Sequence, residues 1–111
     1  MHITRTFNAL GDPTRFAIVE RLLKEGEMSA GDIVAGAAIS APAISRHLKV
    51  LCDAGVLERR IDKQRRMYSA SPGALRQISA WTGSYSDFWN ARVDRLQAAV
   101  EATAPKGTPN G

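Results

Sequence analysis

Residues 40–55 constrain the fold of this chain most strongly, because they carry a start signal, an apolar stripe and a stop signal for one helix. Ser40 is suited to cap the helix by accepting a hydrogen bond from the backbone N–H of Ala43, and Pro42, which has no N–H, fits the first turn. Gly55 is suited to the left-handed backbone conformation that ends helices. We therefore predict a helix that begins at Ser40 and ends before Gly55.

The apolar residues of this segment recur at intervals of four and three, so that one helix face must be buried. That face carries Ile44, Leu48 and Leu51. The opposite side carries Pro42, Arg46, Lys49 and Asp53, with Ser45 and His47 at its flanks. The pattern by itself also fits an ordinary amphipathic surface helix, so the role of the cationic side depends on its neighbours in the chain.

A second short helix is predicted immediately before this segment. Ser29 and Asp32 resemble a capping box in which Asp replaces the usual Glu, and the helix that they open runs to Ala37. A turn of about three or four residues then leads to the helix capped by Ser40. Two short helices with this spacing are typical of a helix-turn-helix.

The periodicity changes after the second of these helices. Leu57, Arg59 and Ile61 alternate with charged residues, and a second strand at residues 67–70 follows the polar tip at residues 63–66. Because the tip has no glycine and no Asn-Gly pair, we predict a loop of four or five residues rather than a two-residue type I′ turn. A basic hairpin in this position is a wing, and a solvated charged loop is the alternative interpretation.

The length and the net charge of the chain indicate one small basic domain. We assign residues 1–103 to this domain and residues 104–111, which are rich in Pro, Gly and Thr, to a disordered tail. The net charge of +4 is only a weak sign of an anionic partner. Its distribution is more informative, because nearly half of the 15 basic residues lie in one short stretch: Arg46, Lys49, Arg59, Arg60, Lys63, Arg65 and Arg66.

Two helices are predicted near the start of the chain. Residues 3–10 form a weak one, which presents Ile3, Phe7 and Leu10 on one side. Asp12 then caps a helix that has Pro13 in its first position and runs to about Glu25. The buried stripe expected for this second helix comprises Phe16, Val19, Leu22 and Leu23.

The end of the chain is predicted to be helical, with a short helix at residues 74–79 and a longer one at residues 80–102. A stripe of mostly aromatic and apolar side chains, with one arginine, recurs along the longer helix at helical spacing: Trp81, Tyr85, Phe88, Trp89, Arg92, Val93 and Leu96. A chain this small has little core left to cover such a stripe, which favours a dimer interface. Packing within the chain and a small hydrophobic ligand cavity are the alternatives.

Several classes of protein are excluded by the composition. Cys52 is the only cysteine, so no disulfide can form within the chain, and no apolar run approaches the length of a membrane span. With no targeting segment at the amino terminus, we expect a cytoplasmic protein. Two distant histidines, one cysteine and no Gly-rich phosphate loop leave no catalytic constellation, so we expect neither an enzyme nor a cofactor.

Over roughly residues 3–102 the chain resembles the ArsR/SmtB-like family of bacterial winged helix-turn-helix repressors. The resemblance rests on Leu10-Gly11-Asp12-Pro13-Thr14-Arg15, on residues 40–51 followed by Ala54-Gly55-Val56-Leu57, and on Arg65-Arg66-Met67-Tyr68. It implies a mainly α fold with a small β-hairpin and a homodimer that binds double-stranded operator DNA and releases it on a signal. The first and last helices would form the interface, through Ile3, Phe7, Leu10, Trp81, Tyr85, Phe88, Trp89, Arg92 and Leu96.

Many members of this family sense a metal through two cysteines early in the first helix of the helix-turn-helix, or through His and carboxylate ligands on the last helix. This chain has Ser29 and Gly31 where the cysteine pair would fall, and no histidine after His47. Softer metals require thiolate or imidazole ligands. We therefore expect no metal site, and a branch of the family that responds to another signal, such as a small-molecule inducer.

The resemblance implies that Ser45, Arg46 and Lys49 approach the major groove, where Arg46 would bind a guanine edge and Lys49 a phosphate. Ala41 stands where the family commonly carries Gln, so an amide able to read adenine is missing. The wing would contact phosphates or the minor groove. The complete set of expected DNA contacts is Ser40, Pro42, Ala43, Ser45, Arg46, His47, Lys49, Arg60, Lys63, Gln64, Arg65 and Arg66.

The sequence allows two interpretations of His47, of Cys52 and of the winged helix as a whole. His47 either binds a phosphate or is a half-buried imidazole satisfied by the backbone. Cys52 is either a small buried apolar residue or the sensor of a redox-responsive repressor. Tyr68 is expected to pack the wing onto the core. A winged helix also serves protein or RNA contacts, because a fold does not fix a function.

Overall fold

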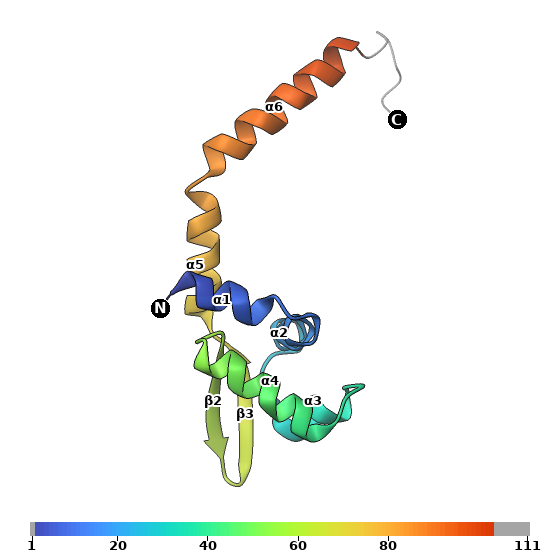
Figure 1. Ribbon diagram of the computed structural model, residues 1–111, viewed down its shortest axis with the longest axis vertical. Helices are drawn as coiled ribbons and strands as arrows, with labels where there is room; N and C mark the ends of the chain where they lie inside the picture. The colour runs from blue at the N-terminus through green and yellow to red at the C-terminus, as the bar shows by residue number, and fades with distance from the viewer. Residues whose placement is uncertain (1, 104–111) are drawn as a thin grey trace. The chain divides into compact units, whose positions relative to one another are not determined.

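The computed structural model describes residues 2–103, and the chain divides into two compact units, Met1–Ile78 and Ser79–Gly111. The tail expected at residues 104–111 lies outside the described residues. Along the chain the elements are α1 (Ile3–Leu10), α2 (Pro13–Glu25), β1 (Met28–Ser29), α3 (Ala30–Ala35), α4 (Ala41–Asp53), β2 (Leu57–Asp62), β3 (Arg65–Ala70), α5 (Pro72–Gly83) and α6 (Ser86–Thr103) (Figure 1). None of the helices within residues 2–103 has the length and apolar character to cross a bilayer.

Local hydrogen bonds start the helices where the sequence predicts. A side-chain oxygen accepts from a backbone N–H of the first turn in α2, α3 and α4, which satisfies a donor that the helix itself leaves free. The pairs are Asp12 and Arg15 (3.0 Å), Ser29 and Asp32 (3.1 Å), and Ser40 and Ala43 (3.3 Å). After α4, Gly55 has a φ of 77°, the left-handed conformation expected of a residue that follows a helix.

The core lies where α2, α4 and the sheet meet. The stripe predicted for α4 is confirmed, since Ile44, Leu48 and Leu51 are each at most 3% exposed. Tyr68 is also buried, which confirms that it packs the wing onto the core. The remaining core residues are Ala9, Ile18, Val19, Leu22, Ile33, Val56 and Leu57.

The stripe predicted for α2 is partly wrong. Val19 and Leu22 are buried, but Ile18 joins them, while Phe16 and Leu23 are each 49% exposed. The reason is that α1, α4 and β3 all pack on the side of α2 that holds the three buried residues. Phe16 and Leu23 instead line an open apolar groove, whose other walls include Phe7, Leu10, Leu75 and Ile78.

Helix α1 buries small residues, and the side that carries Ile3, Phe7 and Leu10, which was predicted to face a partner chain, stays at least partly exposed. Its fully buried residues are Thr6 and Ala9, and Phe7 is exposed. Ile3 and Leu10 are only partly buried. Small side chains face the core here, so α1 can lie close to α2 and α4.

The wing belongs to an antiparallel sheet with strand order β1-β3-β2, in which the short strand β1 was not predicted from the sequence. The hairpin is confirmed, but its predicted loop length is wrong. Asp62 pairs with Arg65, so that only Lys63 and Gln64 form the loop. Lys63 adopts a φ of 59°, a conformation uncommon outside glycine, and Gln64 does not, so the loop is not the type I′ turn that the sequence argued against.

The two C-terminal helices divide at a different place from the one predicted. α5 continues to Gly83 and α6 begins at Ser86, whereas the sequence analysis placed the boundary after residue 79. The Ser84 hydroxyl donates to the Trp81 carbonyl oxygen at 2.7 Å and thereby satisfies a carbonyl at the end of α5. Trp81 consequently belongs to α5, and the aromatic stripe is divided between two helices. α3 likewise ends at Ala35 rather than Ala37.

Candidate nucleic-acid interface

Helix α4 is held by its apolar side and exposes its cationic side. Ser45, Arg46 and Lys49 are exposed, whereas the stripe on the other side of the helix is buried in the core. Arg46 has no ion pair with any residue in the described part of the chain. Lys49 Nζ lies 2.8 Å from Asp53 Oδ2, and this hydrogen bond raises the pKa of the lysine. Such exposed pairs are weak in water, so a phosphate can replace the carboxylate.

The first turn of α4 offers short side chains. The Ser40 hydroxyl accepts the backbone N–H of Ala43 and is therefore engaged in capping. Pro42 is exposed and Ala43 is half-buried. A DNA backbone can approach this end of the helix closely, because none of these side chains extends far from the main chain.

The wing has two different faces. Residues that pair across antiparallel strands point to the same side of the sheet. Arg59 pairs with Tyr68 and Ile61 with Arg66, which places both arginines on the face that also carries the buried Tyr68. This face adjoins α4, and the groove between them is lined by Ser45, Lys49, Arg59 and Arg66 among others.

The other face of the wing is tied to the body of the domain. Arg60 donates to both carboxylate oxygens of Glu27, at 2.8 Å from Nε and 2.6 Å from Nη2. Hydrogen bonding to Arg60 lowers the pKa of Glu27. Arg65 Nη2 lies 3.8 Å from Asp32 Oδ2 on the same side. The structure therefore separates Arg60 and Arg65, both expected to contact DNA, from Arg46 and Lys49.

Arg59 is the cation that the sequence analysis left out of its list of DNA contacts. The alternation of Leu57, Arg59 and Ile61 contained the signal, because Leu57 is buried and residues at this spacing share its face. Lys63 and Gln64 are exposed at the tip of the wing. The cations of the wing that lie next to α4 are thus Arg59 and Arg66.

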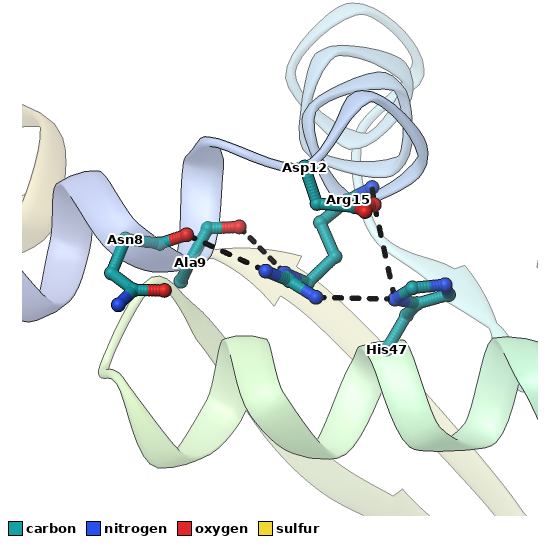
Figure 2. A network of polar contacts seen from close by, with 5 residues as sticks. All are labelled: Asn8, Ala9, Asp12, Arg15 and His47. Atoms are coloured by element: carbon teal, nitrogen blue, oxygen red, sulfur yellow. Dashed lines mark hydrogen bonds and ion pairs between the residues drawn. The ribbon is translucent and has the colours of Figure 1, made fainter.

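His47 contacts the start of α2, as Figure 2 shows. Its Nδ1 lies 3.5 Å from Arg15 Nη1 and 4.0 Å from Asp12 Oδ2, and its side chain is 24% exposed. The imidazole is half-buried, as one of its two interpretations requires, but its contacts are side chains rather than the backbone. Arg15 also donates to the carbonyl oxygens of Ala9 (2.7 Å) and Asn8 (3.4 Å), near the end of α1. The Gly-Asp-Pro-Thr-Arg motif therefore connects α1, α2 and α4.

Cys52 is partly buried beside the groove between α4 and the wing. Burial raises the pKa of its thiol. A redox sensor needs the opposite shift, because the thiolate is the reactive form. Among residues 2–103, no three His, Cys, Asp or Glu side chains are grouped in a way that would hold a metal ion.

A family model described as a helix-turn-helix domain matches residues 10–60. HTH-type transcriptional regulator Rv2034 of Mycobacterium tuberculosis is 42% identical over 98 residues, which are 88% of this chain and 88% of that protein. Transcriptional repressor SdpR of Bacillus subtilis is 39% identical over 79 residues, 71% of this chain and 87% of the repressor. An ArsR-like transcriptional regulator from Rhodococcus sp. RHA1 matches in structure with a TM-score of 0.64 and 27% identity, covering 94% of this chain and 93% of that one. The chain therefore belongs to the ArsR family of winged helix-turn-helix transcriptional regulators and is a DNA-binding regulator of transcription.

Proposed function

We propose that the protein is a homodimeric repressor that inserts α4 of each copy into the major groove of an operator half-site. One observation carries this proposal: α4 is fixed to the core by its apolar side, while Arg46 extends from its exposed side without an ion-pair partner in residues 2–103. An arginine presented in this way can donate to both acceptors of a guanine edge. Ser45 and Lys49 are exposed on the same side of α4, where they would approach base edges and phosphates.

The wing would supply affinity that does not depend on sequence. Arg59 and Arg66 line the groove beside α4, and Lys63 is at the tip. Contacts of these cations with phosphates release counterions, so affinity would fall steeply as salt increases. Arg60 and Arg65 would act mainly by fixing the wing to the body through Glu27 and Asp32.

The dimer is proposed because each unit exposes apolar surface. Helix α6 has 18 residues, none of which is buried against the described residues, whereas in proteins most of the stability of a helix comes from the packing of one of its faces. Large apolar side chains are exposed along the C-terminal unit: Trp81, Tyr85, Phe88, Trp89, Val93, Leu96 and Val100. Arg92 lies 4.7 Å from the centre of the Phe88 ring, and the Trp81 and Tyr85 rings are 5.6 Å apart. We propose that these residues, together with Ile3, Phe7 and Leu10, form the interface, as apolar patches of this size do.

We also propose that the signal releasing the DNA is not a metal. Ser29 and Gly31 occupy the positions of the cysteine pair, and the Ser29 hydroxyl is engaged in capping α3. The protein would act in the cytoplasm, bound to DNA, and no enzymatic step is required.

The DNA-binding proposal is tested by fluorescence anisotropy with the promoter fragment next to the gene, over a series of salt concentrations. Arg46→Ala is expected to weaken binding by about 1–3 kcal/mol and to relax the preference at one base pair of each half-site. Arg76→Ala, which removes an exposed arginine on α5, is the matched control and should bind as the wild type does. Equal binding by Arg46→Ala and the wild type would contradict the assignment of α4.

The dimer is tested by analytical ultracentrifugation, in which two chains of 12.0 kDa should sediment together. Trp89→Glu is expected to give monomers and to weaken DNA binding with it, because a dimer engages two half-sites about one helical turn apart. A monomeric wild-type protein at micromolar concentration would refute this part of the proposal.

A further inference from the structure

A cavity of about 350 Å³ lies behind the helix-turn-helix, between α2, α3 and the start of α4. Its walls are almost entirely apolar and include Ala17, Ile18, Leu22, Met28, Ile33 and Ile39. Small-molecule sites in proteins have about this size and this apolar character. An engineered cavity of roughly 150 Å³ already binds benzene, so this one has room for a bicyclic molecule.

Within residues 2–103, Arg21 is the one ionisable side chain that lines this cavity. Its Nε donates to Glu25 Oε2 at 2.8 Å, and its Nη1 donates to the carbonyl oxygen of Ile33 at 3.3 Å. The second bond joins α2 to α3 and fixes the guanidinium at the cavity wall. Glu25 has a side chain that is 56% exposed, so its pair with Arg21 is weakened by water and can be replaced.

Gly36 makes room for this guanidinium. Its φ of −92° and ψ of 4° are available to any residue, so the backbone does not require glycine here. A Cβ atom at this position would lie 2.7 Å from Arg21 Cζ, closer than real atoms pack. The missing side chain therefore serves to hold Arg21 against the turn that follows α3.

We propose that this cavity binds a small apolar carboxylate, with the hydrocarbon part among Ile18, Leu22 and Ile33 and the carboxylate on Arg21. A guanidinium offers only donors and stays charged, so the polar group that complements it is an acceptor with negative charge. Among the described residues the walls offer no other charged side chain, and the transfer of a bulky apolar body out of water lowers the free energy. The ligand class follows from these two properties together.

Binding would be coupled to DNA, and this step rests on the proposed function. Ile39 in the turn and Ile44 on α4 both line the cavity, and Ile44 is buried two positions before Arg46. A ligand that fills the cavity presses on the turn and on the first part of α4, and so shifts the side chains that approach the groove. Because coupling between two sites is reciprocal, DNA and ligand would each weaken the binding of the other.

The direct test is an NMR titration of the full chain with 2-naphthoate, compared with the neutral 2-naphthamide. Saturable shifts of the backbone amides of Gly36, Ala37 and Ile39, with naphthoate binding about tenfold tighter than the amide, would support the proposal. No saturable shift, equal affinity for the two probes, or shifts centred on the separate groove at Phe7 and Phe16 would overturn it.

Two variants test the role of Arg21, with Arg76→Gln as the matched control. Arg21→Gln should remove the preference for the acid, and Gly36→Ala should weaken naphthoate binding while retaining the charge, since the added Cβ displaces the guanidinium. The dispersion of the amide spectrum shows whether each variant is folded. If Arg21→Gln unfolds, the affinity of Gly36→Ala for naphthoate tests the role of Arg21 instead. A preference for the acid that survives in both folded variants would refute the assignment of Arg21.

A DNA measurement separates the two proposals. With operator DNA present, naphthoate at a concentration that fills the wild type but not Arg21→Gln should weaken operator binding by the wild type about tenfold and leave that of Arg21→Gln unaffected. Ligand binding without any effect on DNA affinity would overturn the coupling. Failure to bind operator in the absence of any ligand would instead contradict the proposed function and leave the cavity assignment to the NMR result.

Discussion

Arg15 Nη1 lies 3.5 Å from His47 Nδ1 and so joins the first turn of α2 to the helix proposed to enter the major groove (Figure 2). The same guanidinium donates to the carbonyl oxygens of Ala9 and Asn8 near the end of α1. The last turn of a helix leaves its carbonyl oxygens without donors in the helix, so Arg15 satisfies the Ala9 carbonyl, while the Asn8 carbonyl also accepts from the backbone N–H of Gly11 at 3.2 Å. One side chain thus holds three helices in a fixed relation.

Removal of this side chain should destabilise the domain. Arg15→Ala leaves the Ala9 carbonyl without its donor, and we expect the free energy of unfolding to fall by about 1–3 kcal/mol. Urea denaturation followed by circular dichroism measures the change. Arg76→Ala, at an exposed site, should change the free energy by less than about 0.5 kcal/mol. Equal stabilities of the two variants would show that the Arg15 network contributes nothing.

Asp12 should make the stability depend on pH. The hydrogen bond from the Arg15 backbone N–H holds the pKa of Asp12 below its ordinary value of 3.8. A lowered folded-state pKa gives stability that is complete above the unfolded value and is lost as pH falls through the folded one. Asp12→Asn can still cap α2 but has no charge to titrate.

The stability difference between the wild type and Asp12→Asn should therefore be constant from pH 7 to pH 5 and decrease below about pH 4. Urea midpoints at pH 7, 5 and 3 measure it. A difference that stays the same at all three values would show that the Asp12 carboxylate is not selectively stabilised in the folded state.

Neighbouring residues on α4 should respond very differently to truncation. Leu51 is fully buried in the core, and Leu51→Ala should cost about 2–5 kcal/mol of unfolding free energy. Val50 is 42% exposed, so Val50→Ala should cost well under half as much. Thermal or urea unfolding of the pair checks the assignment of helix faces, and similar losses at both positions would refute it.

Substitutions of the adjacent residues Arg59 and Arg60 on β2 should have different effects on DNA affinity. Arg59→Ala should weaken binding to all sequences and reduce the slope of log K against log salt by about 1, because one phosphate contact is lost. Arg60→Ala removes the ion pair with Glu27 on the far face, so its slope should stay close to that of the wild type. Binding isotherms at several salt concentrations measure both slopes, and the reverse order would overturn the assignment of the two wing faces.

The thiol of Cys52 should react slowly with alkylating reagents. Because burial raises its pKa, less thiolate is present at neutral pH than for a free cysteine, and alkylation by iodoacetamide should be slower than that of N-acetylcysteine. DNA binding by Cys52→Ser should respond to mild peroxide as the wild type does. Rapid alkylation, or a peroxide response that disappears in Cys52→Ser, would restore the redox interpretation.

Short-range interactions account for what the sequence determined by itself. The caps at Asp12, Ser29 and Ser40 are hydrogen bonds to a backbone N–H three residues away, and the buried stripe of α4 follows from helix geometry alone. These features give the order of helices, the helix-turn-helix and the cationic side that carries Arg46. No distant part of the chain is needed to decide them.

Only the tertiary structure decided which of the remaining cations are free to contact DNA and which apolar side chains are exposed. Arg60 meets Glu27, and His47 meets Arg15, across more than thirty positions of sequence, and neither pairing leaves a local pattern. The exposure of Phe16 depends on which side of α2 its neighbours cover. The alternation along β2 places Arg59 on the same side as Leu57, but only the packing of that side against α4 and the core decides that Arg59, and not Arg60, lies beside the helix.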